Sequence, residues 1–270
     1  IMKYYLRILV IGLVETCNSF NPLIQQFSQG KNQYQKISGN FYKKYEPGLT
    51  KWPSDNQCLF FTGGSSSIPC ELYNSFLTKL SSKNLSISVV NPEIRNQYII
   101  LQSLTYNKPI TLIAHSSGAT TALEACNYLE NIENVILIDP VDTRFFSKEK
   151  TLDEVNPRHK IENLLFINAE KSYEWTMFPF KIPFIPVFSL PKDKVISNNK
   201  QFITAKEYGH CDILDYPWGK IMHNTLSRGV EDRDELKIER YHNWIGDIIS
   251  NYIENKNIHV EDSSVSYRTH

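Results

Sequence analysis

Past residue 48, short apolar runs alternate with segments whose apolar residues recur at the spacing of a helix. The first run ends in Gly63-Gly64, and the segment after it places Leu72, Phe76 and Leu80 on one helical face. Strands that alternate with helices predict an α/β fold with a mostly parallel, doubly wound sheet and flanking helices. The predicted strands are residues 57–62, 86–91, 110–113, 134–138, 163–169 and 201–205, and the predicted helices are residues 70–82, 92–106, 119–129 and 236–255.

Residues 172–191 interrupt this alternation. They contain six aromatic residues and four prolines, and the prolines exclude a helix or a central strand. We expect an aromatic loop beyond the end of a strand, where α/β sheets form their pockets. Its rings could line the pocket or cover the sheet edge as ordinary core. The candidate substrate-binding residues are Tyr173, Trp175, Phe178 and Phe180.

The N-terminal residues have the composition of a targeting segment. A basic opening and a short apolar run predict a signal peptide over residues 1–19, and the acid-poor, basic residues 20–47 predict a transit peptide or N-terminal extension. Phe20 makes this leader similar to the bipartite leaders of algae with secondary plastids. We therefore expect a plastid location. An ordinary signal peptide followed by an N-terminal strand, with secretion, is an equal alternative, and a simple buried first strand is the third. Residues 48–257 are then the α/β domain, and residues 258–270 a polar, frayed tail.

Charge and cysteine content exclude several classes of function. Lys plus Arg and Asp plus Glu both number 29, so no net field favours nucleic acid or an anionic membrane. The five cysteines are scattered and never in C-x-x-C, which argues against a disulfide framework or a zinc site. We expect Cys58 and Cys126 to pack in the core.

The pentapeptide Ala114-His115-Ser116-Ser117-Gly118 lies between a predicted strand and a predicted helix. This context is that of a nucleophile elbow of the G-x-S-x-G type, with alanine at the first glycine position. Small residues flank the nucleophile because the turn is tight and approaches neighbouring strands. Ser116 is therefore the candidate nucleophile.

A serine hydroxyl needs a base to accept its proton and a carboxylate to orient that base. His210 lies in a loop just after the last predicted strand, and chain order in folds with this elbow places the histidine last. For the acid, Asp139 at the tip of the strand after the elbow ranks first, followed by Glu170 and then Asp142.

The backbone N–H groups of Ser117 and Gly64 are the candidate oxyanion hole. Gly63-Gly64 could instead simply make a tight turn. His115 is expected to support the elbow rather than to take part in catalysis. The sequence contains no phosphate loop, paired-carboxylate pattern or metal-ligand spacing that competes with this site.

Together these segments resemble the chlorophyllase family, α/β-hydrolases that cleave the phytyl ester of chlorophyll. The resemblance runs from about residue 57 to the final helix. It rests on Phe60-Phe61-Thr62-Gly63, Tyr73-Asn74-Ser75-Phe76, the elbow, Ile138-Asp139-Pro140-Val141-Asp142, and Tyr208-Gly209-His210-Cys211-Asp212-Ile213-Leu214-Asp215. The last segment is the most specific, since the elbow is shared by many hydrolases.

The resemblance implies a triad of Ser116, Asp139 and His210 in an α/β-hydrolase fold, and hydrolysis of chlorophyll to chlorophyllide and phytol through an acyl-enzyme. No cofactor is implied, because the magnesium belongs to the substrate. The partner is then an apolar ester, whose location could bring the protein to a membrane surface. A general carboxylesterase or lipase, and a non-catalytic pigment or lipid binder, are the alternatives. Departures from the family pattern concern the mouth of the site: Ala114 and Ala119 replace glycine, Ser117 replaces arginine, and Thr62 replaces histidine.

Overall fold

A computed structural model gives the architecture of the chain. It describes residues 42–45, 56–66, 68–90, 109–142, 157, 161–174, 176–177, 182–183, 189–221, 234–255 and 265–269. The predicted signal peptide, most of the predicted extension over residues 20–47 and the predicted helix over residues 92–106 lie outside these ranges.

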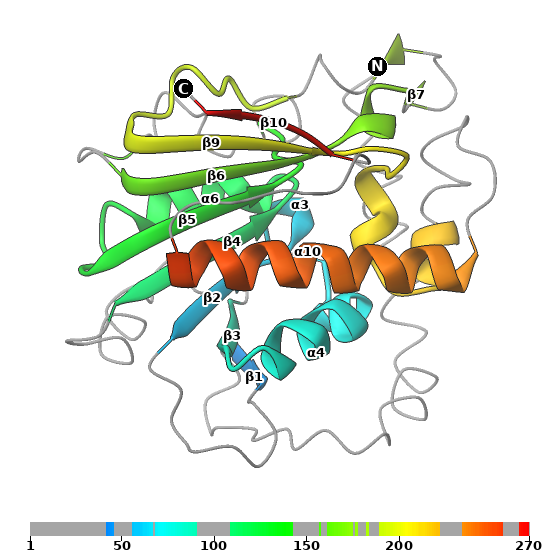
Figure 1. Ribbon diagram of the computed structural model, residues 1–270, viewed down its shortest axis with the longest axis horizontal. Helices are drawn as coiled ribbons and strands as arrows, with labels where there is room; N and C mark the ends of the chain where they lie inside the picture. The colour runs from blue at the N-terminus through cyan, green and yellow to red at the C-terminus, as the bar shows by residue number, and fades with distance from the viewer. Residues whose placement is uncertain are drawn as a thin grey trace, which may run out of the picture.

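An eight-stranded sheet forms the centre of the fold (Figure 1), in the spatial order β1-β3-β2-β4-β5-β6-β9-β10. The six inner strands run parallel, which confirms the predicted mostly parallel sheet. Apolar runs produce these strands because a parallel sheet is covered on both faces. The inner strands are β3 (Ser86–Val90), β2 (Gln57–Phe61), β4 (Ile110–His115), β5 (Ile132–Ile138), β6 (Ile161–Ala169) and β9 (Ser197–Ala205).

Two edge strands were absent from the strands predicted above, although an N-terminal strand was one of the alternatives for the leader. β1 (Tyr42–Tyr45) pairs antiparallel with β3, and β10 (Val265–Thr269) pairs antiparallel with β9. The sheet therefore extends beyond residues 48–257 at both ends. The expectation of a frayed tail is wrong for the residues of β10, because a row of sheet hydrogen bonds holds them.

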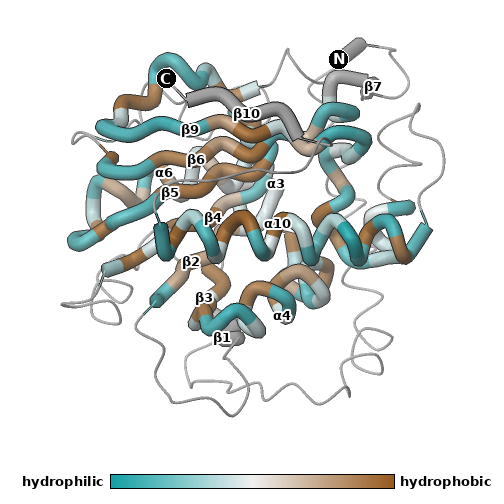
Figure 2. Tube along the Cα trace, in the orientation of Figure 1, coloured by the Kyte–Doolittle hydropathy of each residue, from teal (hydrophilic) through white to brown (hydrophobic). Residues whose placement is uncertain are grey.

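Helices cover the two faces of the sheet unequally. Helix α4 (Asn74–Ser82), preceded by the 3₁₀ turn η1 (Cys70–Tyr73), and the long α10 (Glu235–Asn255) lie on the near face in Figure 1, and α6 (Gly118–Ala125) lies behind the sheet. We call these the α4–α10 face and the α6 face. In Figure 2 the inner strands are mostly apolar, whereas α10 alternates between apolar and polar residues, as expected for a helix with one buried side.

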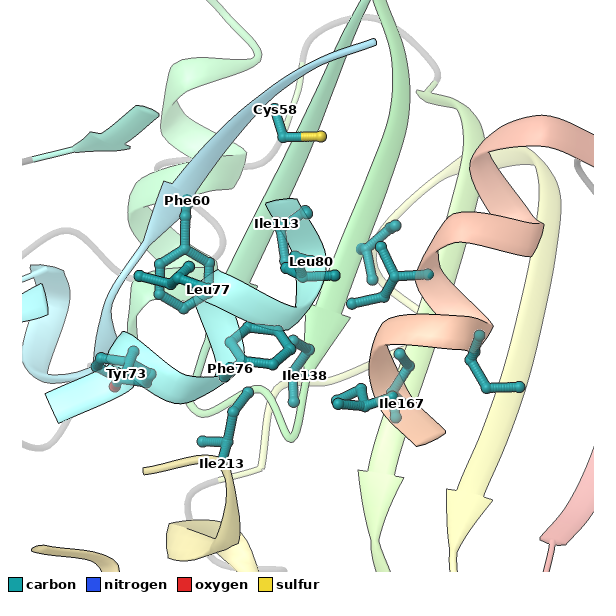
Figure 3. Close-up of a cluster of buried hydrophobic side chains, with 14 of the residues drawn as sticks. Cys58, Phe60, Tyr73, Phe76, Leu77, Leu80, Ile113, Ile138, Ile167 and Ile213 are labelled. Atoms are coloured by element: carbon teal, nitrogen blue, oxygen red, sulfur yellow. The ribbon is translucent and has the colours of Figure 1, made fainter. Parts of the chain in front are cut away.

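Strand alternation sorts the core into two clusters. Along β4, Ile113 belongs to the cluster under α4 and α10, and Ile110, Leu112 and Ala114 belong to the cluster under α6. Cys58, as expected, is buried in the first cluster. Figure 3 shows the first cluster, with side chains of η1 and α4 such as Phe76 and Leu80 lying over the sheet.

Several short elements connect the strand ends. They are α3 (Gly63–Ser66), η4 (Glu170–Glu174), η5 (His210–Ile213), and the strands β7 (Thr176–Met177) and β8 (Ile182–Pro183). β7 and β8, which are described parts of the aromatic segment, pair with each other in a separate two-stranded sheet. No helix in the described part of the chain combines the length and apolarity that a membrane span requires.

Candidate active site

The turn between β4 and α6 holds its central serine in a strained backbone conformation. Ser116 has φ 55°, in the left-handed region that costs a non-glycine residue about 1–3 kcal/mol. Three backbone hydrogen bonds hold it there. The Ser116 amide donates to the Ile138 carbonyl (3.0 Å), and the Ser116 carbonyl accepts from the amides of Ala119 (3.2 Å) and Val141 (3.0 Å). The elbow is thus fixed both by its own helix and by the end of β5.

Gly118, the last residue of the pentapeptide, is required by close packing. A Cβ atom there would lie 2.4 Å from the Thr62 carbonyl oxygen and 2.6 Å from that of Phe61. Ala114 at the other flank sits within β4, paired with Phe61 and Leu137, and its methyl group is fully buried. The structure therefore accommodates alanine at the first position and only glycine at the second.

Ser116, His210 and Asp139 meet at the carboxyl edge of the sheet. The Ser116 hydroxyl oxygen lies 2.9 Å from His210 Nε2, and His210 Nδ1 lies 2.5 Å from Asp139 Oδ2. All three are nearly buried, with exposed fractions of 9%, 7% and 5% in that order. A hydroxyl in contact with an imidazole, which in turn contacts a carboxylate, has the geometry for nucleophilic catalysis assisted by a base.

Asp139 is held by groups from three neighbouring elements. Its φ of 43° turns the chain at the tip of β5, and its amide donates to the Ile167 carbonyl of β6 (2.7 Å). Its Oδ1 accepts from the Ala169 amide (3.1 Å), and its Oδ2 accepts from the Ser172 hydroxyl (2.5 Å) as well as facing His210. The carboxylate is therefore fixed in orientation before it contacts the imidazole.

The same contacts keep Asp139 ionised. Burial raises the pKa of its carboxyl, but the hydrogen bond and charge of His210, together with the Ser172 hydroxyl and the Ala169 amide, lower that pKa by more. The net pKa lies below the ordinary value for an aspartate. A charged carboxylate can stabilise a protonated His210.

The other two candidate acids are placed differently. Glu170 is exposed, and its Oε2 accepts from the Glu207 amide (3.1 Å). Asp142 is buried in the turn after β5. Asp139 is thus the ranked candidate whose carboxylate the structure places against His210.

The loop that carries His210 is anchored by the aspartates that follow it. Asp212 Oδ2 accepts from the Gly209 amide (2.6 Å), and the Asp212 carbonyl lies 3.1 Å from Nε2 of His242 on α10. Asp215 accepts from the Ser75 amide at the start of α4 through both of its oxygens (2.8 and 3.1 Å). Asp212 and Asp215 therefore each make a contact that fixes the loop.

His115 is buried beneath the His210 loop. Its Nδ1 lies 2.8 Å from the Tyr73 hydroxyl, and its Nε2 lies 3.0 Å from the His210 carbonyl oxygen. Burial, together with the charge of nearby His210, lowers the pKa of His115 to about 3. His115 is thus a neutral imidazole that touches the His210 loop rather than the nucleophile.

The two candidate oxyanion donors lie in the turns on either side of Ser116. Ser117 is the N-cap of α6 and directly follows the nucleophile. Gly64 has φ 61° in α3, and the neighbouring Gly63 amide already donates to the Tyr73 hydroxyl (3.0 Å). The glycine pair therefore opens a short helix where a loop was expected, and Gly64 remains a candidate oxyanion donor.

Of the four aromatic residues suggested for substrate binding, Tyr173 lies in η4, although its side chain is not described. Trp175, Phe178 and Phe180 lie outside the described residues. Within the described ranges, no cluster of three His, Cys, Asp or Glu side chains could hold a metal ion.

Two residues at the site were not assigned a role from the sequence. Tyr73 contacts His115 across 42 positions of sequence, and Ser172 contacts Asp139 across 33. Tyr73 begins a segment that resembles the family motif, which marks it without explaining it. Ser172 carries no sequence signal beyond its place shortly after a strand.

Comparison with known proteins finds similarity in fold. No family model matches the chain, and no curated protein matches its sequence. Among solved structures, the esterase domain of a Rhodothermus marinus protein has a TM-score of 0.50 at 12% identity, over 78% of this chain and 90% of that one. A ferulic acid esterase from Streptomyces cinnamoneus has 0.51 at 12%, over 80% and 74%. A mutant of the esterase rPPE has 0.54 at 12%, over 90% and 94%. With a parallel sheet, flanking helices and a nucleophile elbow in place, the chain has the α/β-hydrolase fold.

Proposed function

We propose that this protein is a serine hydrolase that cleaves carboxylic esters through an acyl-enzyme. The observation that carries the proposal is the continuous contact from Ser116 through His210 to Asp139, with the serine on a strained elbow. The similar structures named above are described as esterases, which supports this reaction class.

The proposed reaction follows from the roles these groups can take. His210 accepts the proton of Ser116 as its oxygen attacks the ester carbonyl, and the amides of Ser117 and Gly64 stabilise the oxyanion. His210 then donates that proton to the departing alcohol, and a water molecule, activated by the same imidazole, releases the acid. Asp139 keeps the imidazole oriented and stabilises its charged form.

A fluorophosphonate probe tests the nucleophile directly. We expect one adduct, on Ser116, and turnover of p-nitrophenyl esters that Ser116→Ala reduces by about 10⁶-fold. The Ser116→Ala protein serves as the control for background labelling. A folded wild-type protein with no adduct and no ester turnover would instead be a non-catalytic binder of pigment or lipid.

The acid is tested by a pair of matched substitutions. Asp139→Asn should lower kcat by about 10⁴-fold, because the amide holds the wrong imidazole tautomer. Glu170→Gln should leave kcat unchanged, since its carboxylate accepts from the Glu207 amide. A large loss confined to Glu170→Gln would reverse the assignment.

Chlorophyll is the narrower candidate substrate, and the resemblance of several segments to chlorophyllases supports it. The departures from the family pattern at Thr62, Ala114, Ser117 and Ala119 weigh against it, because these buried residues lie in the nucleophile elbow and in the oxyanion turn. A general carboxylesterase fits the fold at least as well. Incubation with chlorophyll a beside a panel of p-nitrophenyl esters separates the two. Release of phytol supports the pigment reaction and the plastid location proposed with it, and rapid turnover of short esters without chlorophyllide supports the general esterase.

A further inference from the structure

Four groups link the oxyanion turn to the loop of the catalytic base. The Gly63 amide lies 3.0 Å from the Tyr73 hydroxyl, which lies 2.8 Å from His115 Nδ1. His115 Nε2 lies 3.0 Å from the carbonyl oxygen of His210. This chain of hydrogen bonds runs from the backbone of the oxyanion turn to the backbone of the His210 loop.

The atoms at the two ends fix the direction of every hydrogen bond in this chain. A carbonyl oxygen only accepts, so His115 Nε2 carries the proton and donates it to His210. Nδ1 of the neutral ring is then an acceptor, and the Tyr73 hydroxyl must donate to it. The Tyr73 oxygen in turn accepts from the Gly63 amide.

Burial keeps these protons in place. Tyr73 and Gly63 are buried, and His115 is 2% exposed. Burial raises the pKa of the Tyr73 hydroxyl and lowers that of His115 to about 3, so both stay neutral at physiological pH. Aromatic packing holds the rings as well, since Tyr73 meets Phe60 and His115 edge to face, with ring centroids 5.2 and 5.6 Å apart.

We propose that Tyr73 and His115 are positioning residues that hold the oxyanion turn and the His210 loop at a fixed separation across Ser116. This inference rests on the proposed ester hydrolysis, because the positions it fixes matter only for that reaction. Loss of the Tyr73 hydroxyl frees the turn that carries Gly64, and loss of the His115 donor frees the backbone of His210.

The two ends of this chain of hydrogen bonds affect different steps of the proposed reaction. An oxyanion turn that shifts weakens stabilisation of the tetrahedral intermediate for every ester. A displaced His210 also fails to protonate the leaving group, which matters for an alkoxide but little for p-nitrophenolate, which departs without a proton. The ratio of kcat/KM for an alkyl ester to that for a p-nitrophenyl ester of the same acid therefore reports on the His210 end alone.

Three substitutions separate the two ends. Tyr73→Phe should lower kcat/KM by up to about 10²-fold for both esters, as expected for a misplaced catalytic group. His115→Asn keeps an oxygen near the Nδ1 position for Tyr73 but loses the donor to His210, so the alkyl-to-aryl ratio should fall by about tenfold. His115→Gln keeps a donor near the Nε2 position and should preserve that ratio better than His115→Asn.

Tyr252→Phe is the matched control. Tyr252 is a fully buried tyrosine of the same core cluster, but it lies on α10 and takes no part in the hydrogen bonds from Gly63 to His210. It should leave both kcat/KM values unchanged. Rates are expressed per site titrated with fluorophosphonate, so that unfolded protein does not count. Equal behaviour of all three variants and Tyr252→Phe would overturn the proposal.

A measurement on the unreacted wild-type protein tests the same chain of hydrogen bonds without turnover. Nitrogen-15 NMR of labelled histidine should show His115 as the Nε2–H tautomer, uncharged from pH 8 to pH 5, with Nδ1 shifted in Tyr73→Phe. A charged or Nδ1–H ring would refute the inference even in an active enzyme. An inert wild type with the expected tautomer would refute the proposed function and leave the chain of hydrogen bonds standing as a structural feature only.

Discussion

The cores on the two faces of the sheet contain different kinds of side chain. The core under α6 consists, among the described residues, of aliphatic side chains, alanines and phenylalanines. The core under α4 and α10 includes buried tyrosines and cysteines, and the buried rings of His115 and His242 lie with it. The core under α6 is therefore stabilised mainly by apolar packing, with Lys192 and Asn168 in polar contact beside the Phe166 ring, whereas the core under α4 and α10 also carries a buried network of hydrogen bonds.

Strand alternation explains where this network lies. His115 follows Ala114 on β4, so its side chain points to the face opposite α6, and the His210 loop packs on that same face through Cys211, Ile213 and Leu214. The nucleophile Ser116 directly precedes the helix of the α6 face, whereas its base His210 lies in a loop that packs on the α4–α10 face. Substitutions under α6 should accordingly change stability, and those under α4 and α10 should change catalysis as well.

Gly118→Ala is the largest exception we expect to this division. The added methyl group would meet the carbonyl oxygens of Phe61 and Thr62 at 2.6 and 2.4 Å, and so would push the turn that carries Gly64 away from Ser116. Loss of an oxyanion donor lowers kcat by about 10²–10³-fold. Steady-state kinetics per titrated site measure the effect. An unchanged kcat would show that the turn can move without cost to the site.

Leu123→Ala tests the division in its simplest form. Leu123 lies on the buried side of α6 and is fully buried, and its truncation should reduce the free energy of unfolding by about 2–5 kcal/mol. The kcat per titrated site should stay within about twofold of wild type, because only apolar packing is lost. Urea denaturation and kinetics measure the two quantities, with Leu77→Ala on α4 as a core truncation of the same size. A loss of kcat as large as that in Tyr73→Phe would contradict the comparison.

The sequence predicted the parts of the fold that follow from burial on both faces. The inner strands contain apolar runs, although β9 begins with five polar residues, whereas β1 reads Tyr-Lys-Lys-Tyr and β10 reads Val-Ser-Tyr-Arg-Thr, so neither edge strand has such a run. Lysines suit the exposed edge of a sheet, where they discourage pairing with another chain. The same lysines led us to place residues 42–45 in a basic leader.

At the site, the sequence did not predict contacts between residues that are far apart in the sequence and do not both lie at strand ends. Parallel strands end at one edge, so Ser116, Asp139 and His210 could be brought together from strand ends alone. Tyr73 enters from η1, and Ser172 from the turn after β6, and their contacts depend on how these segments pack. No spacing in the sequence encodes that packing.

Ser172→Ala should have a moderate effect. It removes one donor from Asp139 Oδ2 while the Ala169 amide and His210 remain, and a hydrogen bond to a charged group contributes about 1.5–3 kcal/mol. Since only part of that energy acts in the transition state, we expect kcat to fall by up to about tenfold. Ser81→Ala is the control, because its buried hydroxyl donates to the Thr78 carbonyl on α4. Equal rates in the two variants would remove Ser172 from the network.

His242→Gln tests how the stability of the α4–α10 face depends on pH. Burial lowers the pKa of His242 from 6.5 to about 4, so below pH 6.5 the unfolded chain binds a proton that the folded protein does not. The free energy of unfolding therefore falls as the pH falls from about 6.5 to about 4, by up to about 1.4 kcal/mol per pH unit from this group. Glutamine at 242 can still contact the Asp212 carbonyl but does not titrate.

Urea denaturation of wild type and His242→Gln at several pH values between 4 and 7 measures the difference in slope. The other groups that titrate in this range, including His115, are common to both proteins and cancel in that difference. The variant should lose less stability on acidification than wild type, even where it is less stable at neutral pH. Parallel curves would mean that His242 takes up a proton in the folded state, and that the α4–α10 face is open to water at the contact between α10 and the His210 loop.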